Sequence, residues 1–341
     1  MRSAITSASA HSQTDAELYT LTMQLPHPPS ESTPVRRSWL WMGLRLSLPV
    51  LLLALAWHWL LRHADFEALM RQARGLPTWA WLAAGAALVC GHSLRALRLQ
   101  RQWQHLRPLG LAHCLRLVLT HNAAVILLPL RSGEAGYLWL VYRHWGVPWR
   151  ESGASLLAWR LQDATVLMLL ALVLLLPWSP VARGLLLLCA VTVLVCLHRP
   201  GQLWLARRWP ALVPGPQPGS DHWLRSGWLA SAGNWSLKVL ALGGLLMGLS
   251  GLDLASSLSA ALGGELAGVQ PLQGPAGLGS YEAGVWLAAR ASDTLQATVV
   301  AAALAVHAFA LAIALGAAAL AQLIHAPPLK SDPAPDQARA A

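Results

Sequence analysis

Charged side chains stand at interruptions in otherwise apolar stretches of this sequence, where they could bind an anion or exchange a proton. One apolar stretch, residues 110–146, is broken at residues 128–134, and another, residues 254–292, is broken at residues 271–279. Proline removes a backbone donor and glycine weakens a helix, so both stretches should contain a break in the helix. Irregular backbone at membrane depth must be buried in protein or line a water-filled cavity. Polar chemistry is therefore expected at these two breaks.

At the first break, Arg131 and Glu134 are three residues apart, with Gly133 between them. If Ser132 caps the following helix, both charges lie near a helix N-terminus, whose free N–H groups favour an anion. An arginine fork held there suits a phosphate headgroup. The alternative is that Arg131 and Glu134 neutralise each other and only anchor the loop.

A second pair, Arg160 and Asp163, is also three residues apart and precedes a continuous apolar run. On one helix these side chains share a face and could form an ion pair that points into a helix bundle. The sequence leaves a structural and a functional role equally open.

The second break leads into Gly277, Gly279 and then Glu282. Glycines before a helix leave N–H groups exposed and give a ligand room to approach. Glu282 lies in the first turn, where the helix dipole favours a carboxylate, and that is also its purely structural alternative. Because no basic residue is close in sequence, its partner is expected from elsewhere, such as Lys238 or Arg131.

Lys238 lies well inside another apolar stretch, and a pairing with Glu265 would compensate its charge. The histidines His121 and His307 are given no role, since a lone histidine on an apolar helix is more often a hydrogen-bonded core residue.

The elements that position these residues are membrane helices. The chain has 341 residues, of which 55% are hydrophobic and 12% charged, against about a quarter charged in soluble domains. A helix needs about 20 mostly apolar residues to cross a bilayer. The fold class is therefore all-α, a polytopic helical membrane protein with about six full spans. These spans are expected near residues 41–61, 78–97, 154–177, 181–198, 226–249 and 296–324.

Two topologies are open for the broken stretches. If both are re-entrant, most loop arginines fall on one face, which agrees with the positive-inside rule better than eight full spans do. Either topology places both termini in the cytoplasm. Paired interrupted segments are typical of a transporter binding site. An inverted repeat between the two halves of the chain is one possible arrangement. The formal charge of +10 serves this topology, so no nucleic acid partner is expected.

Three regions are expected along the chain. Residues 1–37 and 326–341 are polar and should be disordered cytoplasmic tails, and residues 38–325 should form the membrane domain. The four cysteines have no metal-ligand spacing, and motifs for nucleotide, hydrolase or zinc chemistry are absent from the sequence. No catalytic residue, metal or cofactor is therefore expected, and the chain is not expected to be an enzyme.

In their order and spacing, three motifs resemble the lysylphosphatidylglycerol synthase transmembrane-region family, also described as flippase-like membrane proteins. They are residues 128–134, residues 160–163 and residues 274–282, and the resemblance covers about residues 40–325. It implies a lipid-handling membrane fold. In fused members such a region delivers aminoacylated phosphatidylglycerol to the outer leaflet, and a cytosolic domain makes that lipid. This sequence shows no such domain, so synthase activity is not expected.

Carried over by position, the resemblance implies a functional set made of Arg131, Glu134, Arg160, Asp163, Gly277, Gly279 and Glu282. To these the sequence adds Gly133 and Lys238. One departure is that the family often has arginine in the last span, where His307 stands in this chain.

The expected function is a flippase or transporter of a lipid or lipid-linked headgroup in a bacterial inner membrane. Its partners would be membrane lipids and an enzyme of envelope-lipid biosynthesis. Arg131 would bind an anionic headgroup, and Glu134 and Glu282 would pair with it in the empty state or exchange a proton. Two other classes stay open: an intramembrane enzyme on a lipid-linked phosphate or sugar, and a non-transporting membrane partner of a glycosyltransferase.

Overall fold

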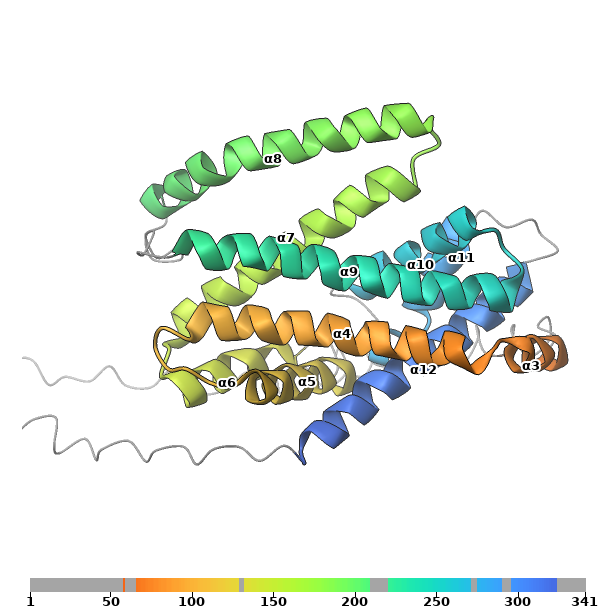
Figure 1. Cartoon of the computed structure of the whole chain (residues 1–341), viewed down its shortest axis with the longest axis horizontal. Coiled ribbons are helices and arrows are strands. Elements are labelled where there is room, and N and C mark those ends of the chain that lie inside the picture. Colours follow the sequence, from red (N-terminus) through yellow and green to blue (C-terminus); the bar gives the residue numbers. More distant parts are fainter. Residues whose placement is uncertain are drawn as a thin grey trace, which may run out of the picture. The chain divides into compact units, whose positions relative to one another are not determined.

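The computed structural model describes His58 and residues 66–128, 132–208, 220–270, 275–289 and 296–323. The expected span at 41–61, both expected tails and Arg131 lie outside these residues. Within the described ranges all regular structure is helical, and Figure 1 labels the helices. Five helices there are long and apolar enough to cross a membrane. The protein is therefore a polytopic α-helical membrane protein.

The five spanning helices are α4 (Thr78–Trp103), α7 (Trp149–Leu174), α8 (Pro180–Arg208), α9 (Ser220–Ser250) and α12 (Gln296–Ala321). They match five of the six expected spans. Several of these helices extend beyond the expected apolar spans, because backbone hydrogen bonds can continue a helix into polar sequence. The helix that holds the span expected at 181–198 continues past that span to Arg208 and contains Pro200.

The helices α4 and α9 pack antiparallel along their lengths (Figure 1). A Cβ on Gly227 would lie 3.3 Å from Arg98 Nε, one on Gly91 would lie 2.8 Å from Asn234 Oδ1, and one on Gly248 would meet Leu76. From Gly227 to Gly248 along α9, the contacted residues run backwards along the chain, from Arg98 to Leu76, so the two helices are antiparallel. Small residues at these crossings let the backbones approach closely, as in membrane helix pairs.

The first broken stretch forms a hairpin from α5 (Leu111–Leu127) and α6 (Glu134–Trp145). The rings of His113 and His144 are 5.1 Å apart, and those of His121 and Tyr137 are 5.7 Å apart. The later residue of α5, His121, contacts the earlier residue of α6, Tyr137, so the two helices are antiparallel. At the turn, a Cβ on Gly133 would lie 2.3 Å from the Ala124 carbonyl, and only glycine fits there.

The second broken stretch forms a matching hairpin from α10 (Leu254–Gly268) and α11 (Ser280–Ala289), joined through the 3-10 turn η2 (Pro275–Gly277). A Cβ on Gly263 would lie 2.4 Å from the Gly284 carbonyl oxygen, and one on Gly284 would lie 2.3 Å from that of Gly263. Asp253 caps α10 by accepting the Ser256 N–H at 3.0 Å.

These arrangements decide between the two expected topologies. With eight full spans, α4 and α9 would run in the same direction, whereas two re-entrant hairpins require them to be antiparallel. They are antiparallel, which agrees with the re-entrant alternative and not with eight full spans. The hairpins enter from opposite ends of the α4–α9 pair, and the turn η2 packs against α5.

The helix order also repeats. A long helix, a hairpin and a long helix follow one another in α4–α7 and again in α9–α12, with the leading helices antiparallel. That is the arrangement of an inverted repeat. The main core is formed by side chains of α9 to α12 together with α4 and α7, among them Leu242, Leu246, Leu262, Val299 and Val306. The helix α8 packs against α7. Most of the apolar side chains described on α8 are exposed.

Candidate functional site

A cavity of about 530 Å³ lies where the tips of the two hairpins meet. Its wall comes from α4, α5, α6, α7, α9, α10, η2, α11 and α12, so both halves of the repeat contribute. Although the helices are apolar, the wall is rich in titratable and amide side chains. They are His92, Arg95, His121, Asn122, Glu134, Arg160, Asp163, Asn234, Lys238, Glu265, Tyr281 and His307.

Glu134 is the first residue of α6 and is bound by Arg160 of α7. Arg160 Nη2 lies 2.9 Å from Glu134 Oε1, and Arg160 Nε donates to Oε2 at 3.3 Å. The two nitrogens therefore meet both carboxylate oxygens, which is the strong, fork-like form of this pair. The pair ties the first hairpin to the following helix and lines the cavity.

Glu282 lies in the first turn of α11 and makes a corresponding contact. His307 Nδ1 of α12 lies 2.8 Å from Glu282 Oε1, and the Gly279 N–H donates to Oε2 at 2.6 Å. The second bond is half of a capping box, since a glutamate three residues into the helix reaches back to its first N–H. The partner expected for Glu282 was Lys238 or Arg131, and the expectation of Lys238 is wrong because His307 holds the carboxylate.

The backbone before Glu282 explains the glycines of the second break. Gly277 has φ +80° and Gly279 has φ +84°, and Ala276, directly before Gly277, has φ +55°. Left-handed conformations cost a side-chain-bearing residue about 1–2 kcal/mol, and glycine avoids this cost. Gly277 lines the cavity, so the chain turns there at the cavity wall.

Lys238 of α9 pairs with Glu265 of α10, with Nζ 2.6 Å from Oε2. This confirms the pairing expected from the sequence. Glu265 is buried, and the Lys238 ammonium also lies 5.4 Å from the centre of the Trp235 ring. The pair faces the cavity from the second half of the repeat.

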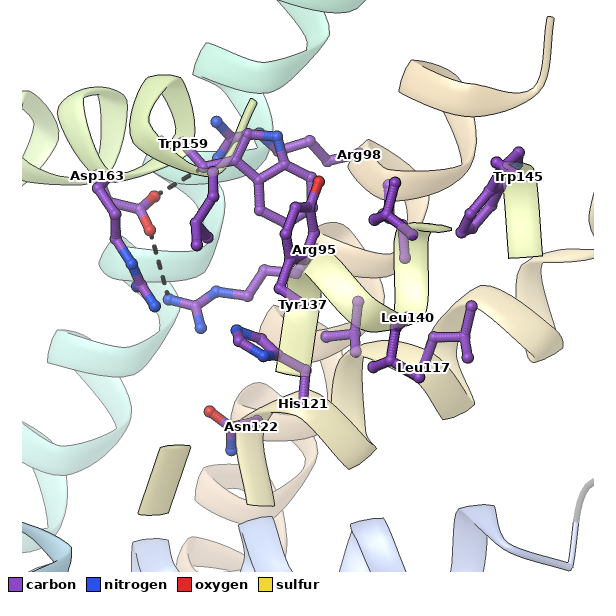
Figure 2. Close-up of a pocket in the computed structure, with 15 residues that line it drawn as sticks. Arg95, Arg98, Leu117, His121, Asn122, Tyr137, Leu140, Trp145, Trp159 and Asp163 are labelled. Carbon is purple, nitrogen blue, oxygen red and sulfur yellow. Dashed lines mark ion pairs between the residues drawn. The ribbon is translucent and has the colours of Figure 1, made fainter. Parts of the chain in front are cut away.

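Asp163 of α7 does not pair with Arg160, so the expected pair within one helix is wrong. Arg95 and Arg98 of α4 approach its carboxylate at 3.7 and 3.6 Å, and Ser231 of α9 donates a hydrogen bond to it. Residues three apart share a helix face, but when that face is buried each can meet a different neighbouring helix. Figure 2 shows the two arginines reaching Asp163.

Next to this cluster lies a second, small cavity of about 40 Å³ (Figure 2). It shares five residues with the large one: Arg95, His121, Asn122, Arg160 and Asp163. Next to it, Trp159 Nε1 donates to Gln102 Oε1 and Gln102 Nε2 donates to Ser155 Oγ, both at 2.6 Å. This buried network could not be predicted from the sequence, because its members come from two helices and none is charged.

Of the predicted site residues, the structure brings Glu134, Arg160, Asp163, Lys238 and Gly277 to the wall of the large cavity. Glu282 and Gly279 lie behind His307 and η2, and Gly133 packs against α5. Sequence reasoning missed His307, and a repeated spacing could have found it. Glu134 precedes Arg160 by 26 residues, and Glu282 precedes His307 by 25.

Among the described residues, no group of three or more histidine, cysteine, aspartate or glutamate side chains is placed to hold a metal ion. What this arrangement can do is bind a polar group inside the helix bundle. Its charges are fixed in position by pairs, and each pair joins two different helices.

The family comparison agrees with the three motifs that occupy this site. Residues 41–318 match the family model described as lysylphosphatidylglycerol synthase TM region. No curated protein and no solved structure matches the chain. Since the match covers most of the chain, including both hairpins and the long helices around the cavity, this protein belongs to the lysylphosphatidylglycerol synthase TM region family.

Proposed function

We propose that this protein moves the polar headgroup of a membrane lipid between leaflets through the cavity between its hairpins. The observation that carries this proposal is the placement of ion pairs from both halves of the repeat on the wall of one cavity. The cavity volume of about 530 Å³ falls within the roughly 300–1,000 Å³ of small-molecule sites. A headgroup would occupy this cavity while the acyl chains stay in the lipid.

The cost of placing charges among membrane helices supports a functional role for them. A charged side chain at the centre of a span costs about 2.5–3.5 kcal/mol on translocon scales. Glu134, Arg160, Asp163, Lys238 and Glu265 all face the same cavity. Pairing reduces this cost, but apolar residues would build the same bundle without it. A polar substrate gives these charges a reason to be there.

Two hairpins that enter from opposite ends suit alternating access. In transporters with inverted repeats, the two halves rock or gate around a fixed central site. Here Glu134–Arg160 ties the first hairpin to α7, and Glu282–His307 ties the second to α12. Breaking one pair while the other holds would open the cavity towards one side only. Because His307 is charged only when protonated, the second pair can also exchange a proton during turnover.

The proposed location is a bacterial inner membrane with both termini in the cytoplasm. The positive-inside rule supports this orientation, since most loop arginines fall on one face in the re-entrant topology. An enzyme that makes the transported lipid is the proposed partner. The chain itself is proposed to relocate the lipid without altering it chemically.

The test is movement of labelled lipids between leaflets in proteoliposomes that contain the purified full-length protein. The panel consists of phosphatidylglycerol, its aminoacylated form and a polyprenyl-phosphate sugar. Glu134→Gln and Glu282→Gln remove a charge but keep the shape, and we expect each to slow transport about tenfold or more. Glu67→Gln is the matched control, since Glu67 forms an exposed pair with Arg71 away from the cavity.

Transport of one lipid class by the wild type and by Glu67→Gln, but not by the cavity variants, supports the proposal. If the wild type moves none of the lipids but converts one of them, an intramembrane enzyme replaces the transporter. If it moves and converts none and both glutamine variants behave as wild type in every assay, a non-transporting membrane partner is favoured.

A further inference from the structure

Two arginines on α4 share one carboxylate, and their surroundings differ. Arg98 has a side chain only 3% exposed, donates hydrogen bonds to Gln162 and Ser231, and lies over the Trp159 ring at 4.5 Å. Its two terminal nitrogens are bound by α7 and α9, and its Nε is buried without a hydrogen-bond partner. Arg98 therefore has the surroundings of a structural residue.

Arg95 lies nearly one turn earlier and lines both cavities. Its side chain is 23% exposed, and its contact with Asp163, at 3.7 Å, is an ion pair without a hydrogen bond. Within the described residues, its other polar contact is the Trp235 ring, 5.5 Å from the guanidinium carbon. The guanidinium therefore presents N–H donors to the cavity that this structure leaves without an acceptor.

The charges around Arg95 do not balance as they do elsewhere on the wall. Lys238 has Glu265 as its carboxylate, and Arg160 has Glu134. In contrast, Arg95 and Arg98 share Asp163, so this cluster has two guanidinium groups for one carboxylate. An anion in the cavity next to Arg95 would complete the balance.

Because Arg95 and Arg98 both contact Asp163, Arg95 can exchange Asp163 for a ligand at a low cost in free energy. Removing one member of a buried ion pair is costly because the other charge is left without compensation. If Arg95 turns from Asp163 to a ligand, Asp163 still keeps Arg98 and the Ser231 hydroxyl. Arg95 can therefore alternate between Asp163 and a ligand without leaving a buried charge unpaired.

The groups beside Arg95 also suit an oxyanion. Figure 2 shows Arg95 extending towards Asp163, with His121 and Asn122 of α5 on its other side. His121 Nδ1 is buried without a hydrogen-bond partner, and both residues line the two cavities. A planar guanidinium that offers several N–H groups binds phosphate oxygens in pairs, and it does so more strongly in a site of low dielectric.

We propose that Arg95 binds the phosphate group of the lipid substrate and exchanges Asp163 for that phosphate when the cavity is loaded. This inference rests on the proposed function and assigns the residue that binds the phosphate of its substrate. Arg98 stays on Asp163 throughout, and the Asn122 amide donates to a remaining phosphate oxygen.

The experiment measures equilibrium binding of labelled dioctanoyl phosphatidylglycerol to the purified full-length protein in detergent, with dioctanoylglycerol as the probe that lacks phosphate. Arg95→Gln should weaken binding of the phosphate-bearing probe about tenfold or more, as for a lost charged hydrogen bond. Binding of dioctanoylglycerol should stay within about twofold. Arg71→Gln, on the exposed pair with Glu67, should bind both probes as the wild type does.

Arg95→Lys tests whether binding needs the paired N–H donors of arginine or only its positive charge. It also tests the inference if Arg95→Gln does not fold. It keeps the charge but loses paired donation, so the phosphate-bearing probe should bind with intermediate affinity. Equal binding of this probe by the wild type and either Arg95 variant would overturn the inference. So would an equal loss for both probes, since that is the result of a purely structural role.

Competition with inorganic phosphate distinguishes the two sources of this chemistry. A lipid site should be blocked by short-chain phospholipid at far lower concentration than by inorganic phosphate, and the reverse order would make free phosphate the ligand.

The outcomes also separate this inference from the proposed function. Binding that depends on Arg95, without leaflet movement, keeps the phosphate site and rejects transport. Leaflet movement of a phospholipid with unchanged binding by Arg95→Gln rejects Arg95 and keeps transport.

Discussion

The carboxylates around the cavity each meet a cation from another helix, so each ion pair is also a link between helices. Glu134 links α6 to α7, Glu265 links α10 to α9, and Glu282 links α11 to α12. Asp163 links α7 to α4 through Arg95 and Arg98. At the scale of single residues, the two arginines on Asp163 differ in exposure and in hydrogen bonding. Arg98 is almost fully buried and donates hydrogen bonds to two other helices, whereas Arg95 is partly exposed and has only the ion pair and the Trp235 ring.

Stability should separate Arg98 from Arg95. In Arg98→Gln the shorter side chain loses its contacts with Asp163 and Ser231, and we expect a loss of about 1.5–3 kcal/mol, the range for hydrogen bonds to charged groups. Arg95→Gln should cost less than about 1 kcal/mol, as for a loose and partly exposed ion pair. Denaturant unfolding of both variants in the same detergent measures the difference. An equal loss for both would show that Arg95 is as structural as Arg98.

Residue spacing could predict which side chains share a helix face, but it could not predict their partners. The sequence placed Arg160 and Asp163 together correctly on one helix, yet Arg160 binds Glu134 and Asp163 binds α4. Partner choice depends on which helices pack together, and hydropathy does not contain that information. Lys238–Glu265 was predictable because few charges lie at that depth. His307 was missed because its meaning comes from comparing the two halves.

At the scale of elements, the hairpins depend on glycines that hold two backbones in contact. Gly133 packs against the Ala124 carbonyl, and Gly263 and Gly284 pack against each other. The breaks themselves were predictable from proline and glycine in an apolar stretch, since these residues act on local backbone. The close approach was not, because a glycine needed for space looks the same in sequence as one needed for conformation. Gly133 has an ordinary helical φ of −58°, so its role is one of space.

Two glycines of the first hairpin provide a matched test of this role. In Gly133→Ala the added methyl group would collide with the backbone of α5, and we expect a loss of about 1–3 kcal/mol from overpacking. In Gly136→Ala, one turn later on α6, the methyl group meets nothing within 4 Å. That variant should be as stable as the wild type or gain up to about 1 kcal/mol through helix propensity. Thermal unfolding of the two variants checks this, and equal stability would mean that the hairpin packs less closely than described.

At the scale of the whole molecule, the two halves share an order of elements but differ in their chemistry. The helix–hairpin–helix order occurs in both, and a glutamate after each break is bound from the next long helix. The basic partner is arginine in the first half and histidine in the second. The shared order of elements explains how both hairpins reach one cavity.

The antiparallel packing of α4 and α9 leads to a topological prediction that needs no substrate. His105 follows α4 and Ala255 begins α10, and both residues are exposed. With re-entrant hairpins they lie on opposite faces of the membrane, whereas eight full spans would place them on the same face. Single cysteines at His105→Cys and Ala255→Cys, in a background without Cys90, Cys114, Cys189 and Cys196, can be labelled with a thiol reagent that does not cross membranes.

In sealed vesicles of one known orientation, the reagent should label only one of the two cysteines from outside, and the other only after the vesicles are opened. This result would fix the hairpins as entering from opposite faces, which the alternating-access proposal requires. Labelling of both from the same side would return the molecule to eight spans. The hairpin tips would then no longer meet from two sides, and the two ion pairs could not act as separate gates to one cavity. The transport proposal thus depends on a feature that can be measured before any lipid is chosen.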